Sequence, residues 1–344
     1  MIESARTAAA SPGRIVTSTT SIEILDLRHF AAALIRPVIE AEGELWRKRL
    51  HWDYRTSAKL LMQYLDSHSL PGYAALEAEK VVGYAFCVYE ETKAIVGDVF
   101  AVDRLLPAAA SLTAPDVETT LLKHLFETLL NSPQVNRVES QLLLHPSGAH
   151  AEIFRANDFR IFRRLFMLQR LQGTASQTRV TLPDELEVRG WRDDDLNSAS
   201  RLIAEAYRGH PDSLINDQYC SVHGSLRFLN NIVRYSGCGQ FSAHASHVVV
   251  HKPSRELIAL ILGSRVSTQS GHITQVCVHP NYRRIGLARM LLSAAADCFT
   301  RQGAEEISLT VTEANSHAID LYKNQGYTCA HVFDAAVWLR GVKG

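Results

Sequence analysis

The chain has 344 residues, a length that predicts two domains rather than one. Its 36 lysines and arginines balance its 36 aspartates and glutamates, and 46% of its residues are hydrophobic, as in an ordinary globular protein. This balance argues against a general affinity for nucleic acid or for an anionic membrane, and no apolar run reaches the roughly 18 residues that span a bilayer.

The six cysteines are scattered, without the CxxC or paired histidine spacing of a metal site. We therefore expect no metal ion, no disulfide framework and a cytoplasmic location. Cys87 and Cys277 lie in apolar, strand-like runs and are expected to be small core residues.

The first half of the chain alternates between strand and helix patterns. Residues 1–21 are rich in serine, threonine and alanine and are interpreted as a disordered tail. Apolar spacing then predicts, in order, a strand at 22–28, helices at 30–47 and 55–66, strands at 72–78, 80–90 and 94–102, a helix at 115–131, a strand at 135–145, a helix at 149–158 and a strand at 159–170.

The second half gives the same series after a polar linker at 172–185. The predicted elements are a strand at 185–191, helices at 195–209 and 224–237, strands at 246–251, 256–266 and 272–279, a helix at 284–303, a strand at 306–312, a helix at 316–326 and final strands at 327–333 and 336–340. An order that appears twice, with a period of roughly 160–170 residues, indicates a duplicated domain.

These patterns predict an α+β fold with two tandem domains, at 22–171 and 186–344. In each domain, most strands follow one another closely and one long helix connects two strands. Such an order favours a central, mostly antiparallel mixed sheet flanked by helices.

One short stretch of the second half predicts an anion site. The sequence HPNYRRIGLARMLL (279–292) places two arginines and Gly286 where a helix begins. A helix start exposes unpaired N–H groups and attracts anions, and a glycine lets an anion approach the backbone closely.

This stretch resembles the acetyl-CoA signature of the GNAT family, the Gcn-related N-acetyltransferases. The family loop Arg/Gln-x-x-Gly-x-Gly/Ala corresponds to residues 283–288. A second family signature, Asn-x-x-Ala-x-x-Leu-Tyr-x-x-x-Gly-Phe/Tyr, corresponds to residues 315–327. The resemblance covers 186–344 well, and it covers 22–171 only through the order of elements.

The resemblance implies acetyl-CoA as cosubstrate. The main-chain amides from Arg284 to Arg289 would bind its pyrophosphate, with further attraction from two guanidinium groups. The preceding strand would pair with the pantetheine amides, and Asn315 would reach the same arm. The implied cofactor-binding residues are Val276, Cys277, Val278, Arg283, Arg284, Ile285, Gly286, Leu287, Ala288, Arg289 and Asn315.

The resemblance also implies a catalytic acid, Tyr322, which would protonate the departing thiolate. A phenol is protonated at neutral pH and can act in this way. No general base follows: Thr310 stands where some relatives have glutamate, and Glu313, His272, His279 and a water relay all stay open. Backbone N–H groups near Val276 would meet the oxyanion. Tyr322 could instead be a core aromatic residue, and Asn315 could be only a helix cap.

The polar connection at 206–219 is expected to cover the acceptor, although a simple surface loop is equally compatible with it. Its hydrogen-bonding and acidic side chains suit an amine. These are Tyr207, His210, Asp212, Asn216, Asp217 and Tyr219.

The first half departs from the signatures. Between its third central strand and its long helix the chain contains no glycine, and Asp116 and Glu118 stand at the helix start, where carboxylates would repel a pyrophosphate. Phe154 falls opposite Tyr322, and Asp158 opposite Gly326. We therefore expect residues 22–171 to be a degenerate copy that does not bind coenzyme A.

The leading hypothesis is an N-acetyltransferase that moves acetyl directly from acetyl-CoA to a primary amine of a small molecule or peptide, with no nucleic acid, membrane or metal involved. A non-catalytic coenzyme A sensor and a structural protein are the alternatives. Mycothiol, aminoglycoside and peptide N-acetyltransferases all fit the resemblance, so the acceptor stays open, as does the use of longer acyl groups. A monomer is favoured over a homodimer because two fused domains could mimic the dimer of single-domain relatives.

Overall fold

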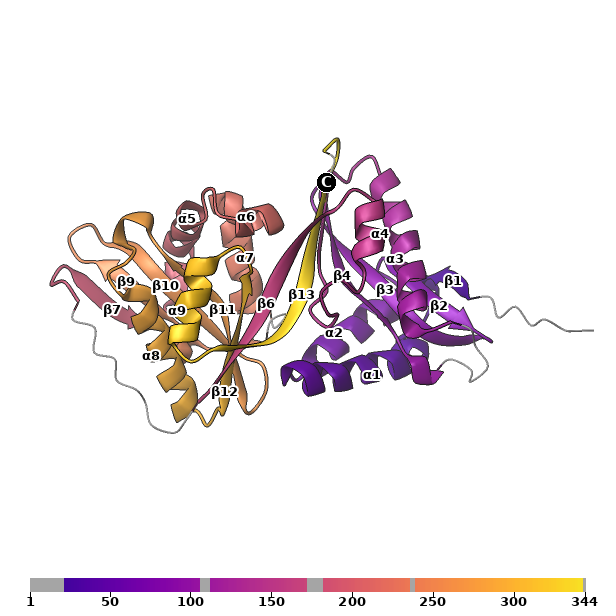
Figure 1. The fold of residues 1–344 in the computed structure, drawn as a ribbon, viewed down its shortest axis with the longest axis horizontal. Coiled ribbons are helices and arrows are strands. Elements are labelled where there is room, and N and C mark those ends of the chain that lie inside the picture. Colours follow the sequence, from indigo (N-terminus) through magenta and orange to yellow (C-terminus); the bar gives the residue numbers. More distant parts are fainter. Residues whose placement is uncertain (1–21, 106–111, 172–181, 236–238, 343–344) are drawn as a thin grey trace, which may run out of the picture.

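The computed structural model describes residues 22–105, 112–171, 182–235 and 239–342. It shows two lobes side by side, one from each half of the chain, and the long strands β6 and β13 run between them (Figure 1). The tail at 1–21 and most of the linker expected at 172–185 lie outside the described residues.

The first half has the order of elements that the sequence predicts. It comprises β1 (Glu23–Asp26), η1 (Leu27–His29), α1 (Ala32–Leu50), α2 (Arg55–Asp66), β2 (Gly72–Glu77), β3 (Lys80–Glu90), β4 (Lys93–Ala101), η2 (Asp103–Leu105), α3 (Ala114–Asn131), β5 (Arg137–Gln141), α4 (Ala151–Ala156) and β6 (Arg160–Arg170).

The second half repeats this order with additions. It comprises β7 (Leu186–Gly190), η3 (Asp193–Asp195), α5 (Leu196–Ala206), α6 (Asp212–Ile215), η4 (Asp217–Cys220), α7 (Val222–Arg234), β8 (Gln240–Phe241), η5 (Ala243–Ala245), β9 (His247–His251), β10 (Glu256–Arg265), β11 (Ser270–Val278), η6 (Pro280–Tyr282), α8 (Leu287–Arg301), β12 (Glu306–Thr312), α9 (Ser316–Asn324) and β13 (Thr328–Leu339).

The connection at 206–219, for which a simple surface loop stayed open, contains α6 and η4. One local prediction was wrong. The two final strands are one strand, β13, whose register shifts between Cys329 and His331. In the described part of the chain, no helix is both long enough and apolar enough to cross a bilayer.

The strands form one continuous sheet in the order β1-β2-β3-β4-β5-β13-β6-β12-β11-β10-β9-β7, with β8 beside β10. The last strand of each half is exchanged: β6 pairs with β12 of the second half, and β13 pairs with β5 of the first. The pairs β4–β5 and β11–β12 are parallel, and the other pairs of the sheet are antiparallel. The prediction of a mostly antiparallel mixed sheet flanked by helices is therefore confirmed.

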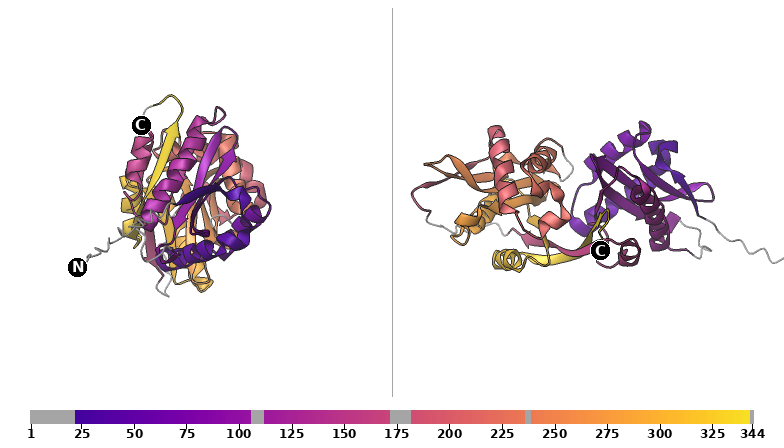
Figure 2. Two further views of the ribbon diagram at one scale, coloured as in Figure 1. Left: turned by 90° about the vertical axis from the view of Figure 1, so that its right-hand side faces the viewer. Right: turned by 90° about the horizontal axis from the view of Figure 1, so that it is seen from above.

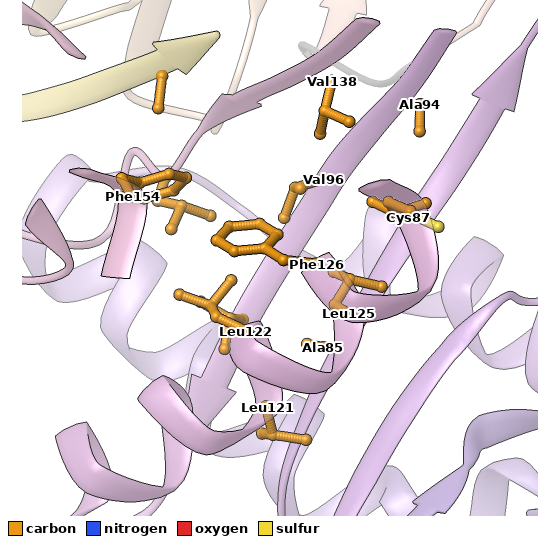
Figure 3. Close-up of a cluster of buried hydrophobic side chains, with 14 of the residues drawn as sticks. Ala85, Cys87, Ala94, Val96, Leu121, Leu122, Leu125, Phe126, Val138 and Phe154 are labelled. Atoms are coloured by element: carbon orange, nitrogen blue, oxygen red, sulfur yellow. The ribbon is translucent and has the colours of Figure 1, made fainter. Parts of the chain in front are cut away.

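The long helix of each half packs against its sheet through residues four apart. In α3 the buried residues include Leu121, Leu125 and Leu129, and Figure 3 shows two of them with Phe126 facing β3, β4 and β5. In α8 the same spacing buries Leu287, Leu291, Ala295 and Phe299. Such spacing places one face of a helix on the core.

Two sheet glycines set how closely α8 approaches. A Cβ added to Gly263 or to Gly271 would lie 3.0 Å or 2.8 Å from the ring of Phe299, so a larger residue would push the helix away. The close contact joins the last turn of α8 to the first residues of β11. Seen from above, the two lobes flank the strands that they share (Figure 2).

Candidate active site

A cavity of about 1170 Å³ opens in the second half, where β11 and β12 part. Their parallel ladder runs from the pair Ser270–Glu306 to the pair Ile273–Leu309 and ends there. Just beyond it, Thr274 is an extra residue in β11, because Leu262 pairs with Gln275 whereas Gly263 pairs with Ile273. This bulge bends β11 away and opens a wedge between the strands.

Almost all of the site residues implied by the sequence line this cavity. They are Val276, Cys277, Val278, Arg283, Arg284, Gly286, Leu287, Ala288, Arg289, Asn315 and Tyr322. Ile285 is not among the lining residues, and its side chain is 45% exposed. Its place in a cofactor site would therefore depend on its backbone alone.

The start of α8 has the backbone of an anion site. Gly286 is the N-cap with φ of 91°, and Arg284 also adopts a left-handed conformation, with φ of 66°. The first intrahelical bond of α8 runs from Met290 N–H to Gly286 C=O, at 3.0 Å. The amides just before Met290 therefore have no helical acceptor, and the first turn of α8 contains no acidic residue.

The Arg283 side chain donates hydrogen bonds to two backbone carbonyls beside the wedge. Its Nη2 donates to Ala206 C=O at 2.8 Å, and its Nε donates to Val278 C=O at 3.3 Å. The arginine thus links the end of α5 to the end of β11. It places a fixed positive charge beside the loop that precedes α8.

The free edge of β11 faces the wedge through alternate residues. His279 N–H donates to Ile258 C=O of the neighbouring strand β10 at 2.8 Å. Because hydrogen-bonding direction alternates along a strand, the backbone groups of Val276 and Val278 point the other way, into the wedge. A side chain meets one of them, since Val276 N–H donates to Gln275 Oε1 at 2.9 Å.

Tyr322 and Asn315 enter the cavity from α9. Asn315 caps this helix, since its Oδ1 accepts from Ala318 N–H at 3.2 Å, and its Nδ2 lies 3.1 Å from His210 Nε2. Tyr322 is 7% exposed. Burial, with a smaller contribution from the charge of Asp212, raises the pKa of Tyr322 and keeps its phenol protonated.

Of the six polar side chains in the segment expected to cover an acceptor, all but one reach the cavity. Tyr207, His210, Asp212, Asn216 and Tyr219 line it, and Asp212 accepts a hydrogen bond from the Thr312 hydroxyl of β12. Asp217 instead forms an ion pair with Lys93 of the first half, beside Glu139.

The first half contributes two side chains that the sequence did not indicate. Arg164 of β6 and Gln141 at the end of β5 line the cavity, and Arg164 Nη1 donates to Gln141 Oε1 at 2.5 Å. Arg164 also lies 3.4 Å from Thr310 Oγ1. Both residues reach the cavity because β6 and β13 are exchanged, and no local signal in the sequence predicts that exchange.

Of the three side chains considered as a general base, only His272 lines the cavity. Glu313 pairs with Arg163 at 3.4 Å, and His279 pairs with Glu205 at 3.4 Å; neither is a lining residue. Burial lowers the pKa of His272 to about 3, and its Nδ1 lies 2.9 Å from Ser308 Oγ. His210 also lines the cavity, and the sequence analysis considered it only as an acceptor contact.

Cys277, the cysteine that lines the cavity, does not resemble an activated nucleophile. Cys277 is 7% exposed, and burial raises the pKa of its thiol to about 12. Cys87 is also buried, so both residues are core residues as predicted. A thiol that is not ionised at neutral pH does not favour an acyl-enzyme.

The fold and the cavity define an α+β protein in which a helix start with unpaired amides lies beside an open strand edge. Residues 214–327 match the acetyltransferase (GNAT) family. This match falls within the second half of the chain.

Three relatives illustrate the range of similarity. The chain is 39% identical over 57 residues to the N-terminal acetyltransferase B complex catalytic subunit naa20 of Schizosaccharomyces pombe, covering 17% of this chain and 32% of that protein. It is 38% identical over 60 residues to an N-alpha-acetyltransferase of Sulfurisphaera tokodaii, covering 17% and 36%. It is 26% identical over 199 residues to a mycothiol acetyltransferase of Geodermatophilus obscurus, covering 55% and 59%. The chain thus spans between about a third and three-fifths of these relatives.

Solved structures match the fold across both halves. One is a GCN5-related N-acetyltransferase from Sphaerobacter thermophilus, with a TM-score of 0.62 and 16% identity over 94% of this chain and 98% of that one. Another is a tandem GNAT protein from the clavulanic acid biosynthesis pathway, with a TM-score of 0.59 and 13% identity over 94% and 100%. At this identity the likeness shows the fold alone.

Proposed function

We propose that the second half binds acetyl-CoA and transfers its acetyl group directly to a primary amine. The observation that carries this proposal is the shared cavity, which joins the start of α8, the free edge of β11 and Tyr322. An anion site, a strand edge and an acid are the groups needed to hold a pyrophosphate, a pantetheine amide and a leaving thiolate.

The residues present suit coenzyme A. The backbone amides at the start of α8 would donate to the pyrophosphate, and the left-handed Gly286 would allow its close approach. Val276 and Val278 would pair with the pantetheine amides in place of their present partners, Gln275 Oε1 and the Arg283 guanidinium. Each exchange replaces one hydrogen bond by another, so little polar desolvation opposes binding.

The transfer itself needs one proton removed and one supplied. The neutral amine nitrogen attacks the thioester carbonyl carbon, and a new C–N bond forms while the oxyanion is met by a backbone N–H group near Val276. Collapse of the tetrahedral species breaks the C–S bond, and the thiolate takes the Tyr322 proton. The raised pKa of Tyr322 keeps its phenol protonated at neutral pH, and the same shift makes the phenol a weaker acid toward the thiolate.

His210 is the group that we assign as the acceptor of the amine proton. It lines the cavity, and its Nδ1 accepts from Asp212 N–H at 3.2 Å and lies 3.9 Å from a carboxylate oxygen of Asp212. For Nε2 to take the amine proton, Nδ1 would have to carry the ring hydrogen and direct it at that carboxylate. Burial lowers the pKa of His210 and favours its neutral form at pH 7. Its Nε2 would first exchange the Asn315 amide for the incoming amine.

The first half is proposed to support the acceptor side rather than to catalyse. Arg137 Nη2 donates to Leu214 C=O at 2.7 Å, and Lys93 pairs with Asp217, so the short helices α6 and η4 rest on the first lobe. Gln141 and Arg164 would close the far wall of the cavity. A monomer remains our proposal for the quaternary state.

The test is a screen of the full chain against a panel of primary amines with acetyl-CoA, followed by release of free thiol. The proposal expects amine-dependent thiol release with at least one amine class and a matching gain of acetyl mass on the amine. Binding of acetyl-CoA without amine-dependent release across the panel would favour a coenzyme A sensor. Absence of binding would leave only a structural role.

A further inference from the structure

In the first half, β4 and β5 part in the same way as β11 and β12 do in the second. Side chains of the first half fill the wedge between them. The β4–β5 ladder ends at the pair Val96–Ser140, and Gly97 is the extra residue of β4, as Thr274 is in β11. Counting from the last ladder pair, Val99 corresponds to Val276 and Ala101 to Val278. Ala101 N–H donates to Glu118 Oε1 at 3.1 Å, and Val99 C=O lies 2.8 Å from His145 Nε2.

These contacts fix which atoms of Glu118 and His145 remain available. A carbonyl oxygen only accepts, so His145 Nε2 carries the hydrogen and its Nδ1 carries a lone pair. The second oxygen of Glu118, Oε2, lies 3.6 Å from that Nδ1. An anionic oxygen and a nitrogen lone pair therefore face each other inside the protein.

A third ligand group converges on the same point. His150, just before α4, places its Nε2 at 3.2 Å from His145 Nδ1 and at 3.4 Å from Glu118 Oε2. The residues come from the start of α3, from the segment after β5 and from the turn before α4. Glu118 and His150 are 6% and 5% exposed, and the side chain of His145 is 11% exposed.

The three separations are those of ligands around one tetrahedral ion. Zinc bonds to nitrogen and oxygen of about 2.0–2.1 Å place two tetrahedral ligands about 3.3–3.4 Å apart. The backbone partners of Glu118 Oε1 and His145 Nε2 are the kind of outer contact that orients metal ligands. His150 Nδ1 has no hydrogen-bond partner among the described residues, so His150 lacks the orienting contact that the other two ligands have.

We propose that Glu118, His145 and His150 bind one divalent transition-metal ion, with Zn²⁺ the best match, and that this ion closes the wedge of the first half. Two imidazole nitrogens and one carboxylate oxygen suit zinc, whereas magnesium and calcium take sets of oxygen ligands. A solvent molecule would complete the tetrahedron. The cluster escapes the sequence analysis because its members are 27 and 5 positions apart and no cysteine is involved.

A hydrogen-bonded cluster without metal is the competing explanation. Such a cluster needs a proton on Glu118. The single N–H of His150 cannot donate fully to both Glu118 Oε2 and His145 Nδ1. Burial does raise the pKa of Glu118 to about 8 and lowers the pKa of His145 to about 4 and of His150 to about 3. Neutral imidazoles are also the form that binds metal, so the choice between the two needs a measurement of metal itself.

The experiment uses the full chain without an affinity tag, stripped with a chelator and then titrated with Co²⁺ and Zn²⁺. The proposal expects one ion per chain, visible Co²⁺ bands of tetrahedral intensity without a thiolate charge-transfer band, and displacement by Zn²⁺ but not by Mg²⁺. Glu118→Gln and His150→Gln should each weaken Zn²⁺ binding by more than about 100-fold, whereas His29→Gln, at an exposed histidine of the same half, should not.

Two results would overturn the proposal. The first is a stripped wild-type chain that takes up no Co²⁺ or Zn²⁺ at micromolar concentration. The second is uptake that shows thiolate ligation, or that persists unchanged in Glu118→Gln. The wild-type titration decides the matter even if a variant fails to fold, and none of these readouts depends on acetyl transfer.

Discussion

Phe166, a residue of the first half, lies opposite Thr310 of β12 in the sheet of the second half. The converse exchange pairs Val337 of β13 with Glu139 of β5. Each half therefore obtains a strand from the other, and in an isolated half the last strand would lack both of its sheet partners.

The first prediction concerns cooperativity. Because β6 and β13 complete each other's sheets, we expect the full chain to unfold in one calorimetric transition whose calorimetric and van't Hoff enthalpies agree. The measurement is differential scanning calorimetry of the full chain. Two well-separated transitions would show that the halves are independent and would contradict the exchanged-strand account.

The exchange also marks the limit of what the sequence predicted. Apolar periodicity gave the order of helices and strands, because side-chain direction repeats every two residues in a strand and every 3.6 in a helix. It could not assign partners, because the final strands of both halves have similar patterns and either could pair with either neighbour. Arg164 and Gln141 were missed for this reason.

Tyr322 and Asn315, which the second signature singled out, line the cavity, whereas the general base did not follow from the sequence. Glu313 forms an ion pair with Arg163, and His279 forms one with Glu205, outside the cavity. These tertiary contacts cannot be predicted from the local sequence. Glu118 was read as a residue that would repel a pyrophosphate. The structure adds that it is buried beside two histidines, which local pattern cannot show.

The first half retains the backbone of the second signature with different side chains. Phe154 packs against Phe126 at 5.3 Å between ring centroids, and Asp158 has the left-handed φ of 59° that Gly326 has at 88°. Phe159 N–H donates to Phe154 C=O as Tyr327 N–H does to Tyr322 C=O. Part of the glycine-free loop, residues 106–111, lies outside the described residues.

The second prediction follows from that comparison: the full chain binds one acetyl-CoA, not two. In the first half, the backbone groups that would pair with pantetheine are already hydrogen-bonded: Ala101 N–H to Glu118, and Val99 C=O to His145. Isothermal titration of the full chain should give a stoichiometry near one. A second site of micromolar affinity would show that the first half is not degenerate.

The third prediction tests Tyr322 as the acid. Tyr322→Phe should lower kcat by about 10²-fold or more, because the leaving thiolate loses its proton donor, while acetyl-CoA affinity stays within a few-fold. Tyr327→Phe is the matched control, since Tyr327 is equally buried nearby and its hydroxyl has no hydrogen-bond partner among the described residues. Equal turnover in the two variants would remove Tyr322 from the mechanism.

The fourth prediction concerns pH and His272. Burial lowers the folded-state pKa of His272 to about 3, with a smaller contribution from Arg164, so the unfolded chain binds the proton more readily. The stabilisation is complete above the unfolded pKa of about 6.5 and is lost as pH falls toward 3, at up to about 1.4 kcal/mol per pH unit. Urea unfolding at pH 7 and pH 5 should show a smaller pH dependence in His272→Gln than in wild type. An unchanged pH dependence would place the proton uptake elsewhere.

The most direct test compares two glycines at opposite ends of α8. Gly286 at its start has φ of 91°, and Gly303 after its end has φ of 77° with open space where a Cβ would lie. Alanine strains the backbone at either position, so both variants should lose stability to a similar extent, about 1 kcal/mol. Titration with acetyl-CoA should show affinity lowered more than about 10-fold in Gly286→Ala and unchanged in Gly303→Ala. Equal affinity in both variants would contradict the account that the start of α8 binds the cofactor's pyrophosphate.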